Sequence, residues 1–233
     1  MKGCLAIITA RGGSKRIPRK NIKEFLGEPI INYSIKAALQ AGCFDEVMIS
    51  TDDEEIAEVA RKAGAIVPFI RSEATSDDYS TTADVLKEVL EDYRKAGKFF
   101  KYFCCLYPTA PFVTSDKLSQ AFKLLSESEA KSVVPVVRFG FPIQRSFKLE
   151  DGKVKMNWPE HMNTRSQDLP PAFHDSGQFY FLRTAAFLND GKLFTDFTLP
   201  IEMPESEVQD IDNEEDWKVA EIKYTFLLNK KNT

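Results

Sequence analysis

A strongly basic loop follows the first apolar segment of the chain. In the stretch that begins ARGGSKR, six of the thirteen residues from Arg11 to Lys23 are Lys or Arg. Six cations cannot pack side by side without a counter-charge. A polyphosphate supplies one, and Arg11 and Lys20 are candidate phosphate ligands. Gly12 and Gly13 allow a tight backbone turn that exposes N–H groups to a bound anion.

Other interpretations of the basic loop have to be weighed. A short basic tract is often solvated surface, and it can also be a nucleic-acid patch. The net charge is −4 and the sequence has no other basic stripe, which argues against nucleic-acid binding. GGSKRI does not match the GxGxxG dinucleotide fingerprint, and no GxxxxGK[ST] phosphate loop is present. The paired glycines directly after an apolar segment favour nucleotide phosphates.

A second chemical signal is the acidic pair in VQDIDNEEDW, near the end of the sequence. Asp210 and Asp212 are two positions apart, so in an extended segment their side chains point to the same side, roughly 7 Å apart. Mg²⁺ prefers one or two carboxylates together with substrate phosphates. The alternative for Asp212 is a helix cap, which leaves Asp210 unexplained. Cations for a triphosphate and carboxylates for a metal predict nucleotidyl transfer.

The elements that position these residues alternate along the first part of the chain. The patterns predict strands at 4–9, 46–51, 65–70, 101–107 and 132–137, and helices within 29–42, 52–65, 81–95 and 115–128. This alternation predicts right-handed βαβ units in an α/β fold with a mostly parallel, doubly wound sheet. Ligands of such sheets bind beyond the carboxyl ends of the strands, which is where the basic loop follows its strand.

The rhythm changes after residue 137. Strand-like alternation around an Asp151-Gly152 turn predicts a β-hairpin, a strand follows at 176–183, and a helix is expected over 213–228. We therefore expect a single domain over 1–233 with an inserted hairpin arm at about 139–175.

Composition sets further expectations. Hydrophobic residues make up 43% and charged residues 28%, as in ordinary globular proteins. The sequence shows no signal peptide and no apolar run of roughly 20 residues, so a cytoplasmic protein without a membrane partner is expected. The four cysteines form no CxxC pair, and with two histidines a zinc site is improbable, so we expect buried free thiols.

At these motifs the chain resembles the acylneuraminate cytidylyltransferases, also called CMP-sialic acid synthetases. The segments that carry the resemblance are, in order, ARGGSKRIPRKN, STDDEEIAEVARKAGA, PFIR, LYPTAPF, TRSQDLPPAFHDSGQFY and VQDIDNEEDW. The resemblance covers nearly the entire chain. It implies a Rossmann-like nucleotidyltransferase that transfers CMP from CTP to a nine-carbon nonulosonic acid, with Mg²⁺ as cofactor. It also implies a homodimer, because the inserted hairpin of this family usually reaches into a partner subunit.

The resemblance also implies roles for individual residues. Arg11, Lys20 and Asp210 are the implied catalytic residues, and Asp210 and Asp212 the implied metal ligands. The implied nucleotide contacts are Ala10, Arg11, Gly12, Gly13, Ser14, Lys20, Asn21, Arg71, Ser80 and Tyr107. The implied sugar contacts are Arg165, Gln167, Phe179 and Tyr180, of which the two aromatic residues can equally be core residues on a strand. No general base stands out; His174 is one candidate, and a structural histidine is the alternative.

Tyr107 marks a departure from the sialate-activating members, which usually have Gln at this place. With FPIQR and TRSQDLPP, it makes the chain similar to the branch that activates pseudaminic acid, a bacterial sialic-acid-like sugar used on flagella or surface polysaccharide. N-acetylneuraminate and legionaminate remain alternative sugars, and Tyr107 can instead be a core aromatic.

Two other classes of protein function have to be compared with a nucleotidyltransferase. One is an NAD-dependent oxidoreductase, which the missing GxGxxG disfavours. The other is a non-catalytic nucleotide sensor, which the complete set of site residues disfavours.

Overall fold

The central sheet has the strand order β11-β6-β10-β5-β1-β4, and β9 pairs with β6 beside this path. The computed structural model describes residues 3–77 and 79–231. The strands are β1 (Cys4–Thr9), β4 (Glu46–Ser50), β5 (Tyr102–Leu106), β6 (Ser132–Arg138), β9 (Phe173–Asp175), β10 (Phe179–Arg183) and β11 (Thr198–Glu202). β1 pairs in parallel with β4 and β5, and β11 with β6, whereas β10 runs antiparallel between β5 and β6. The predicted α/β fold with a mainly parallel sheet is confirmed.

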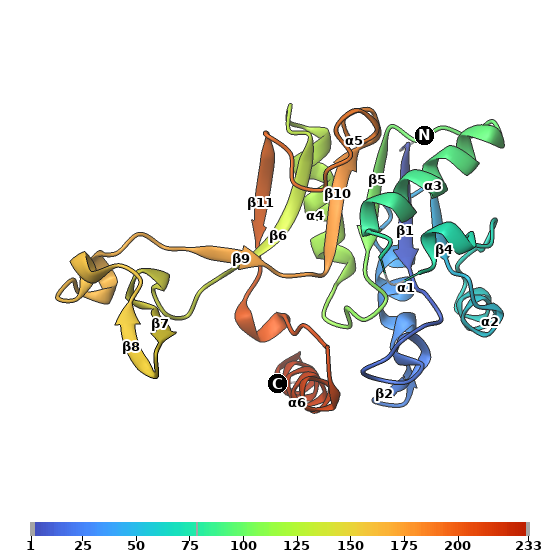
Figure 1. Cartoon of the computed structure of the whole chain (residues 1–233). Coiled ribbons are helices and arrows are strands. Elements are labelled where there is room, and N and C mark those ends of the chain that lie inside the picture. Colours follow the sequence, from blue (N-terminus) through green and yellow to red (C-terminus); the bar gives the residue numbers. More distant parts are fainter. Residues whose placement is uncertain (1–2, 78, 232–233) are drawn as a thin grey trace.

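Helices cover both faces of this sheet. They are α1 (Ile31–Gln40), α2 (Glu54–Lys62), α3 (Thr82–Lys95), α4 (Ser115–Ser126), α5 (Thr184–Asp190) and α6 (Glu214–Lys231). Alternate residues of the buried strands enter two separate cores, so the neighbours Cys104 and Cys105 lie on opposite faces. All four cysteines are buried, and none is in a disulfide bond within the described residues, as the sequence predicts. In Figure 1, α6 and the loop after β1 both lie below the sheet.

Local signals explain where several helices begin. The Asp53 side chain accepts a hydrogen bond from the N–H of Ile56 at the start of α2. Thr81 and Asp84 form the predicted capping box at the start of α3. Each such cap satisfies N–H groups that have no partner inside the helix.

One expected strand is not formed, and two elements of the structure have no counterpart among the expected ones. The predicted strand at 65–70 is reduced to a single bridge between Met48 and Ile66, because Pro68 has no N–H to continue the ladder. The short helix α5 and the strand β11 were not predicted. β11 contains Pro200, which is tolerated because β11 is an edge strand.

The predicted hairpin is present and projects from the sheet. It consists of β7 (Phe147–Glu150) and β8 (Lys153–Met156). Asp151 and Gly152 at its turn have φ angles of 51° and 71°, as a two-residue primed turn requires. Figure 1 shows the segment between β6 and β9 extending away from the other elements; residues 139–172 are called the arm below. A minor sheet pairs β2 (Glu24–Phe25) with β3 (Glu28–Pro29).

No helix within residues 3–77 and 79–231 has the length and apolar character that crossing a membrane requires.

Candidate active site

A cavity of about 480 Å³, here called the basic pocket, opens at the carboxyl ends of β1 and β5. Its lining residues are Thr9, Arg11, Gly13, Ser14, Lys15, Arg16, Lys20, Asn21, Tyr107, Pro108 and Thr109. Six of the residues predicted to contact a nucleotide therefore line one cavity, at the edge of the sheet where ligands of α/β folds bind.

Lys20 joins the basic loop to the acidic segment. Its Nζ donates a hydrogen bond of 2.8 Å to the carbonyl oxygen of Ile211, 191 residues away in the chain. Burial lowers the pKa of Lys20, while the nearby carboxylates of Asp212 and Asp210 act in the opposite direction. Lys20 is thus a desolvated cation that donates a hydrogen bond to a neutral carbonyl oxygen, an arrangement that suits a polyphosphate ligand.

Other cations of the loop are balanced by carboxylates of the same chain. The ion pairs are Arg16–Asp212 at 2.7 Å, Lys23–Glu214 at 2.6 Å and Arg19–Asp53 at 2.5 Å. The ammonium of Lys23 also lies 4.6 Å from the ring centroid of Trp217 on α6. A polyphosphate therefore does not have to balance all six cations, which corrects the simplest interpretation of the loop.

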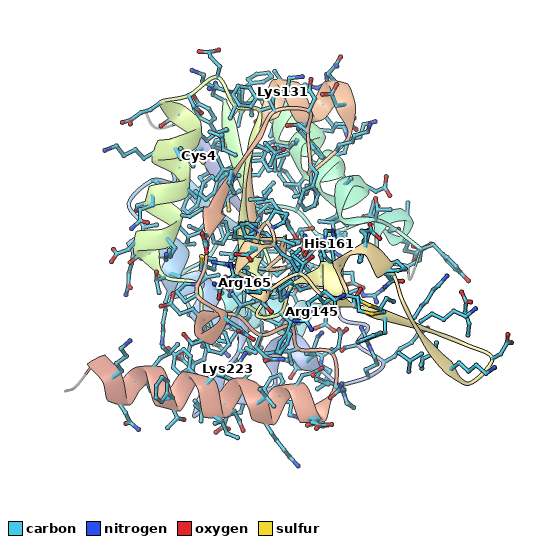
Figure 2. All side chains as sticks on the ribbon, turned by 90° about the vertical axis from the view of Figure 1, so that its left-hand side faces the viewer. Cys4, Lys131, Arg145, His161, Arg165 and Lys223 are labelled. Carbon is cyan, nitrogen blue, oxygen red and sulfur yellow. The ribbon has the colours of Figure 1, made fainter. Side chains whose placement is uncertain are left out.

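The acidic segment before α6 is held in place from several directions. The Lys223 Nζ of α6 (labelled in Figure 2) donates to the Val208 carbonyl at 2.9 Å, and the Gln178 Nε2 donates to the Glu207 carbonyl at 2.8 Å. Asn213, rather than Asp212, caps α6, because its Oδ1 accepts from the N–H groups of residues 215 and 216. The helix-cap alternative for Asp212 is therefore not observed.

The acidic pair has the chemistry of a site for a hard cation. Burial, and next the charge of Asp212, raise the pKa of Asp210. A divalent ion between two such carboxylates relieves their repulsion. Within 3–77 and 79–231, no group of three or more His, Cys, Asp or Glu side chains is arranged to hold a metal alone. Asp210 and Asp212 thus fit an ion that takes its remaining ligands from water and substrate phosphates.

Gly12 is fixed against the start of α2. Its N–H donates a 2.8 Å hydrogen bond to Asp52, and a Cβ at this position would lie 2.7 Å from the Oδ2 of Asp53. Arg19, with a left-handed φ of 54°, donates to both carboxylate oxygens of Asp53. The Arg19–Asp53 pair therefore attaches the basic loop to the start of α2.

This anchor predicts a pH effect on stability. The Arg19 guanidinium, by its hydrogen bond, lowers the pKa of Asp53 from 3.8 to about 2. A depressed carboxyl pKa contributes stability above the unfolded-state value, and this contribution disappears as the pH falls from about 4 to about 2. We expect Asp53→Asn to lower the free energy of unfolding by about 1 kcal/mol at pH 7, a value reduced for partial solvent exposure, and by progressively less in acid. Urea unfolding at pH 7, 4 and 3 measures the difference; a difference that stays constant with pH contradicts the assignment.

Four predicted nucleotide contacts lie in or around the basic pocket in supporting positions. Ala10 is buried and its N–H bonds to the Ser50 carbonyl, while the Asn21 amide donates to the Arg11 carbonyl at 2.8 Å. Arg71 is buried behind the site and bonds to Ser50 through Nε and Nη2. The fourth, Ser80, lies 2.6 Å from the Oδ1 of Asp77, whose carbonyl accepts from the Arg11 guanidinium.

The two predicted aromatic sugar contacts occupy different environments. Phe179 has no exposed surface and packs against Phe181 in the core beneath α1 and α4, so the structure corrects this assignment to core packing. Tyr180 points to the opposite face, and its ring lies 5.8 Å from that of Tyr107. Its hydroxyl donates to the Asp175 carboxylate at 2.5 Å.

The polar sugar candidates lie on the arm. Arg165 pairs with Asp168 at 2.7 Å, and Gln167 lines a separate cavity of about 480 Å³ between the arm and β11. That cavity shares no lining residue with the basic pocket. Figure 2, which faces the arm, labels Arg145 and Arg165, and the Arg145 Nη1 donates to the Ser166 hydroxyl at 3.2 Å. Arg165 and Gln167 are therefore not among the residues that form the basic pocket of their own chain.

Two polar residues beside the site, Arg16 and Asp175, have partners that the sequence alone does not indicate. Arg16 was counted as a cation of the loop, but its partner Asp212 could not be identified without the fold. Asp175 follows His174, whose ring packs against Phe139 with centroids 4.9 Å apart, and its hydrogen-bond partner Tyr180 is recognisable only in the fold. The alternation of Tyr180 and Leu182 with Phe179 and Phe181 along β10 is the signal that places the Tyr180 side chain on one face of the sheet.

A doubly wound sheet with a basic pocket joined to paired carboxylates defines a nucleotidyltransferase type of site. The family model for cytidylyltransferases matches residues 5–211, and the chain belongs to this family.

Named relatives narrow the comparison within the family. The chain is 45% identical to a pseudaminic acid cytidylyltransferase of Campylobacter jejuni, over 94% of this chain and 95% of that protein. It is 31% identical to a CMP-N,N'-diacetyllegionaminic acid synthase of Legionella pneumophila, over 93% and 94% of the two chains. Its structure matches that of a CMP:2-keto-3-deoxy-manno-octonic acid synthetase solved with CTP, with a TM-score of 0.70 at 14% identity, over 97% of this chain and 99% of that chain. At this identity the structural match supports the fold alone.

Proposed function

We propose that this protein transfers CMP from CTP to the anomeric hydroxyl of pseudaminic acid, giving the CMP-sugar and pyrophosphate. The observation that carries the nucleotidyl transfer is the contact between the basic loop and the acidic segment. Lys20 reaches the Ile211 carbonyl and Arg16 reaches Asp212, so residues nearly the whole chain apart form one site. The choice of sugar rests on the 45% identity to the Campylobacter enzyme.

The reaction requires one bond to form and one to break. The sugar 2-hydroxyl oxygen bonds to the α-phosphorus of CTP, the bond from that phosphorus to the bridging oxygen breaks, and pyrophosphate leaves while the hydroxyl proton is released. Lys20 and Arg11 hold the negative oxygens of the triphosphate, and the backbone at Gly13 borders the same cavity. Such prepositioned charges stabilise the transition state without reorganising.

Mg²⁺ is the cofactor that these residues fit. When bound by Asp210 and Asp212, it would neutralise charge on the phosphates. Two carboxylates next to the bound triphosphate match the preference of Mg²⁺ for a few carboxylates, phosphates and water.

We also propose that the protein works as a homodimer in the cytoplasm, where CTP is supplied. The arm exposes large apolar side chains that a second copy can cover: Phe141 is 82%, Leu149 79% and Val154 61% exposed. Exposed apolar clusters of this kind mark interaction surfaces. In a dimer, Arg165 and Gln167 of one copy would lie near the basic pocket of the other copy. Sedimentation of the purified chain should show a species with the mass of two chains.

The test of the function is pyrophosphate release from CTP with a panel of nonulosonic acids. We expect pseudaminate to give the highest kcat/KM, with N-acetylneuraminate and legionaminate at least about ten-fold lower, as differential contacts of 1–2 kcal/mol produce. Turnover of N-acetylneuraminate without turnover of pseudaminate would overturn the choice of sugar. Absence of CTP-dependent pyrophosphate release with every sugar would overturn the reaction.

A further inference from the structure

Asp175 occupies the junction between the arm and the sheet. It is the last residue of β9, where it pairs with Val136 of β6, and a turn at Gly177 with φ 65° then leads into β10. The Oδ1 of Asp175 accepts from the N–H of Gly177 at 3.0 Å, and its Oδ2 accepts from the Tyr180 hydroxyl at 2.5 Å. A single carboxylate therefore holds both the turn and the first aromatic residue on the pocket side of β10.

Tyr180 lies between Asp175 and the basic pocket, because its hydroxyl bonds to Asp175 and its ring packs against a residue that lines the pocket. Tyr180 is 3% exposed, and its ring packs edge-on against Tyr107, which lines the basic pocket. The Tyr107 hydroxyl lies 3.4 Å from the Thr82 Oγ1 at the start of α3, and its N–H donates to the Gln178 carbonyl. Asp175, Tyr180 and Tyr107 thus form a continuous series of contacts from the foot of the arm to the wall of the pocket.

Besides Asp175, the junction is held by the Ser176 N–H, which donates to the Pro135 carbonyl, and by the Gln178 amide, which donates to the Glu207 carbonyl. Ser176 and Gln178 are 4% and 2% exposed, yet the Ser176 Oγ and the Gln178 Oε1 have no hydrogen-bond partner in the described structure. Burial, and next the hydrogen bond to Asp175, raise the pKa of Tyr180, so its hydroxyl stays protonated and donates at any working pH. A short hydrogen bond from a hydroxyl to a carboxylate is among the stronger kinds in proteins.

We propose that Asp175 is a positioning residue for sugar binding: by holding Tyr180 and the turn, it fixes the arm relative to the Tyr107 wall of the basic pocket. This inference rests on the proposed function, because the arm carries the proposed sugar contacts Arg165 and Gln167. The Asp175 carboxylate accepts from Gly177 and Tyr180, whereas Lys20, the proposed phosphate ligand, donates to the carbonyl of Ile211. Loss of the carboxylate should therefore affect the sugar and not CTP.

The test compares Asp175→Ala, Tyr180→Phe and the double variant by steady-state pyrophosphate release. Each single variant should raise the KM for the sugar about ten-fold, as loss of a hydrogen bond to a charged group does, with the KM for CTP changed less than about two-fold. Because both variants remove one contact, the double variant should be no worse than about the more affected single variant. Asp175→Asn, whose amide oxygen still accepts from the tyrosine, should stay within about three-fold of the original enzyme.

Tyr93→Phe is the matched control. The Tyr93 hydroxyl donates to the Glu46 carboxylate at 2.9 Å, and Tyr93 is buried like Tyr180, but Glu46 lies at the amino-terminal edge of the sheet. Loss of the Tyr93 hydroxyl should lower thermal stability and leave the KM for CTP and the KM for the sugar unchanged.

Three results would overturn the inference: an equal rise in both KM values, multiplying effects in the double variant, or the same split with Tyr93→Phe. If Asp175→Ala does not fold, the KM values of Tyr180→Phe alone test the inference, because this variant keeps the ring and loses only the hydroxyl. If the unmodified enzyme turns over no nonulosonic acid with CTP, the proposed function is refuted. This result is obtained before any variant is compared, so it is distinct from a failure of the inference about Asp175.

Discussion

Replacement of Lys20 by alanine is expected to lower kcat/KM for CTP by about 10²- to 10³-fold, the usual cost of removing one preorganised charge from a transition state. Lys20 is the desolvated cation of the basic pocket, and its amine touches the backbone of the acidic segment. Its removal takes away the proposed phosphate ligand and also the hydrogen bond between the basic loop and the acidic segment. Steady-state pyrophosphate release at varied CTP measures the effect.

Lys23→Ala is the control for this prediction. Lys23 belongs to the same loop, but its ammonium is paired with Glu214 and lies over Trp217. We expect its activity to remain within about three-fold of the original, with a stability loss of about 0.5–1 kcal/mol for an exposed pair and a cation–π contact. Equal losses in the two lysine variants would show that the loop acts only through its net charge. Unchanged CTP kinetics in Lys20→Ala would remove Lys20 from the site.

Asp210→Asn is expected to lower kcat about 10³-fold and to raise the Mg²⁺ concentration for half-maximal rate by at least about ten-fold, because an amide is a much poorer ligand for a hard cation than a carboxylate. The substitution keeps the size of the side chain, so the segment held by Gln178 and Lys223 should stay in place. Magnesium titrations of the rate, together with Mn²⁺ binding followed by electron paramagnetic resonance, measure both effects.

The corresponding control is Glu215→Gln. Glu215 lies in the first turn of α6, a few residues beyond the acidic pair, where a carboxylate interacts with the helix dipole. Its loss should cost about 0.3–1 kcal/mol of stability and leave the magnesium dependence unchanged. If Asp210→Asn retained most of its kcat at saturating Mg²⁺, the metal assignment would be wrong.

The sequence was most informative where the signals were local. Buried apolar runs located β1, β4, β5 and β6, and Thr81 with Asp84 identified the start of α3 from side-chain chemistry alone. The Asp151-Gly152 turn identified the hairpin for the same reason: the backbone requires positive φ at both positions. The basic loop and the acidic pair were recognisable because their charges are concentrated in a few residues.

The features of the fold and site that the sequence did not predict depend on contacts between distant segments of the chain. Nothing near Arg16 or Arg19 in the sequence indicates that carboxylates at 212 and 53 pair with them. Phe179 and Tyr180 are neighbours with similar side chains, and only their opposite directions from β10 separate a core residue from one beside the pocket. The apolar pattern at 65–70 predicted a strand, yet Pro68 removes the donor on which a continued ladder depends.

The way the arm joins the sheet has a consequence for how this protein can diversify. The arm leaves at the end of β6 and returns as β9, which pairs antiparallel with β6, so the strands at its two ends are hydrogen-bonded to each other. Mutation, insertion or recombination inside the arm therefore leaves the order of the other strands unaltered. The basic loop and the acidic segment are bound to each other across 191 residues and have no such freedom. If the arm contacts the sugar as proposed, changes confined to the arm would alter the sugar acceptor without altering the proposed nucleotide site.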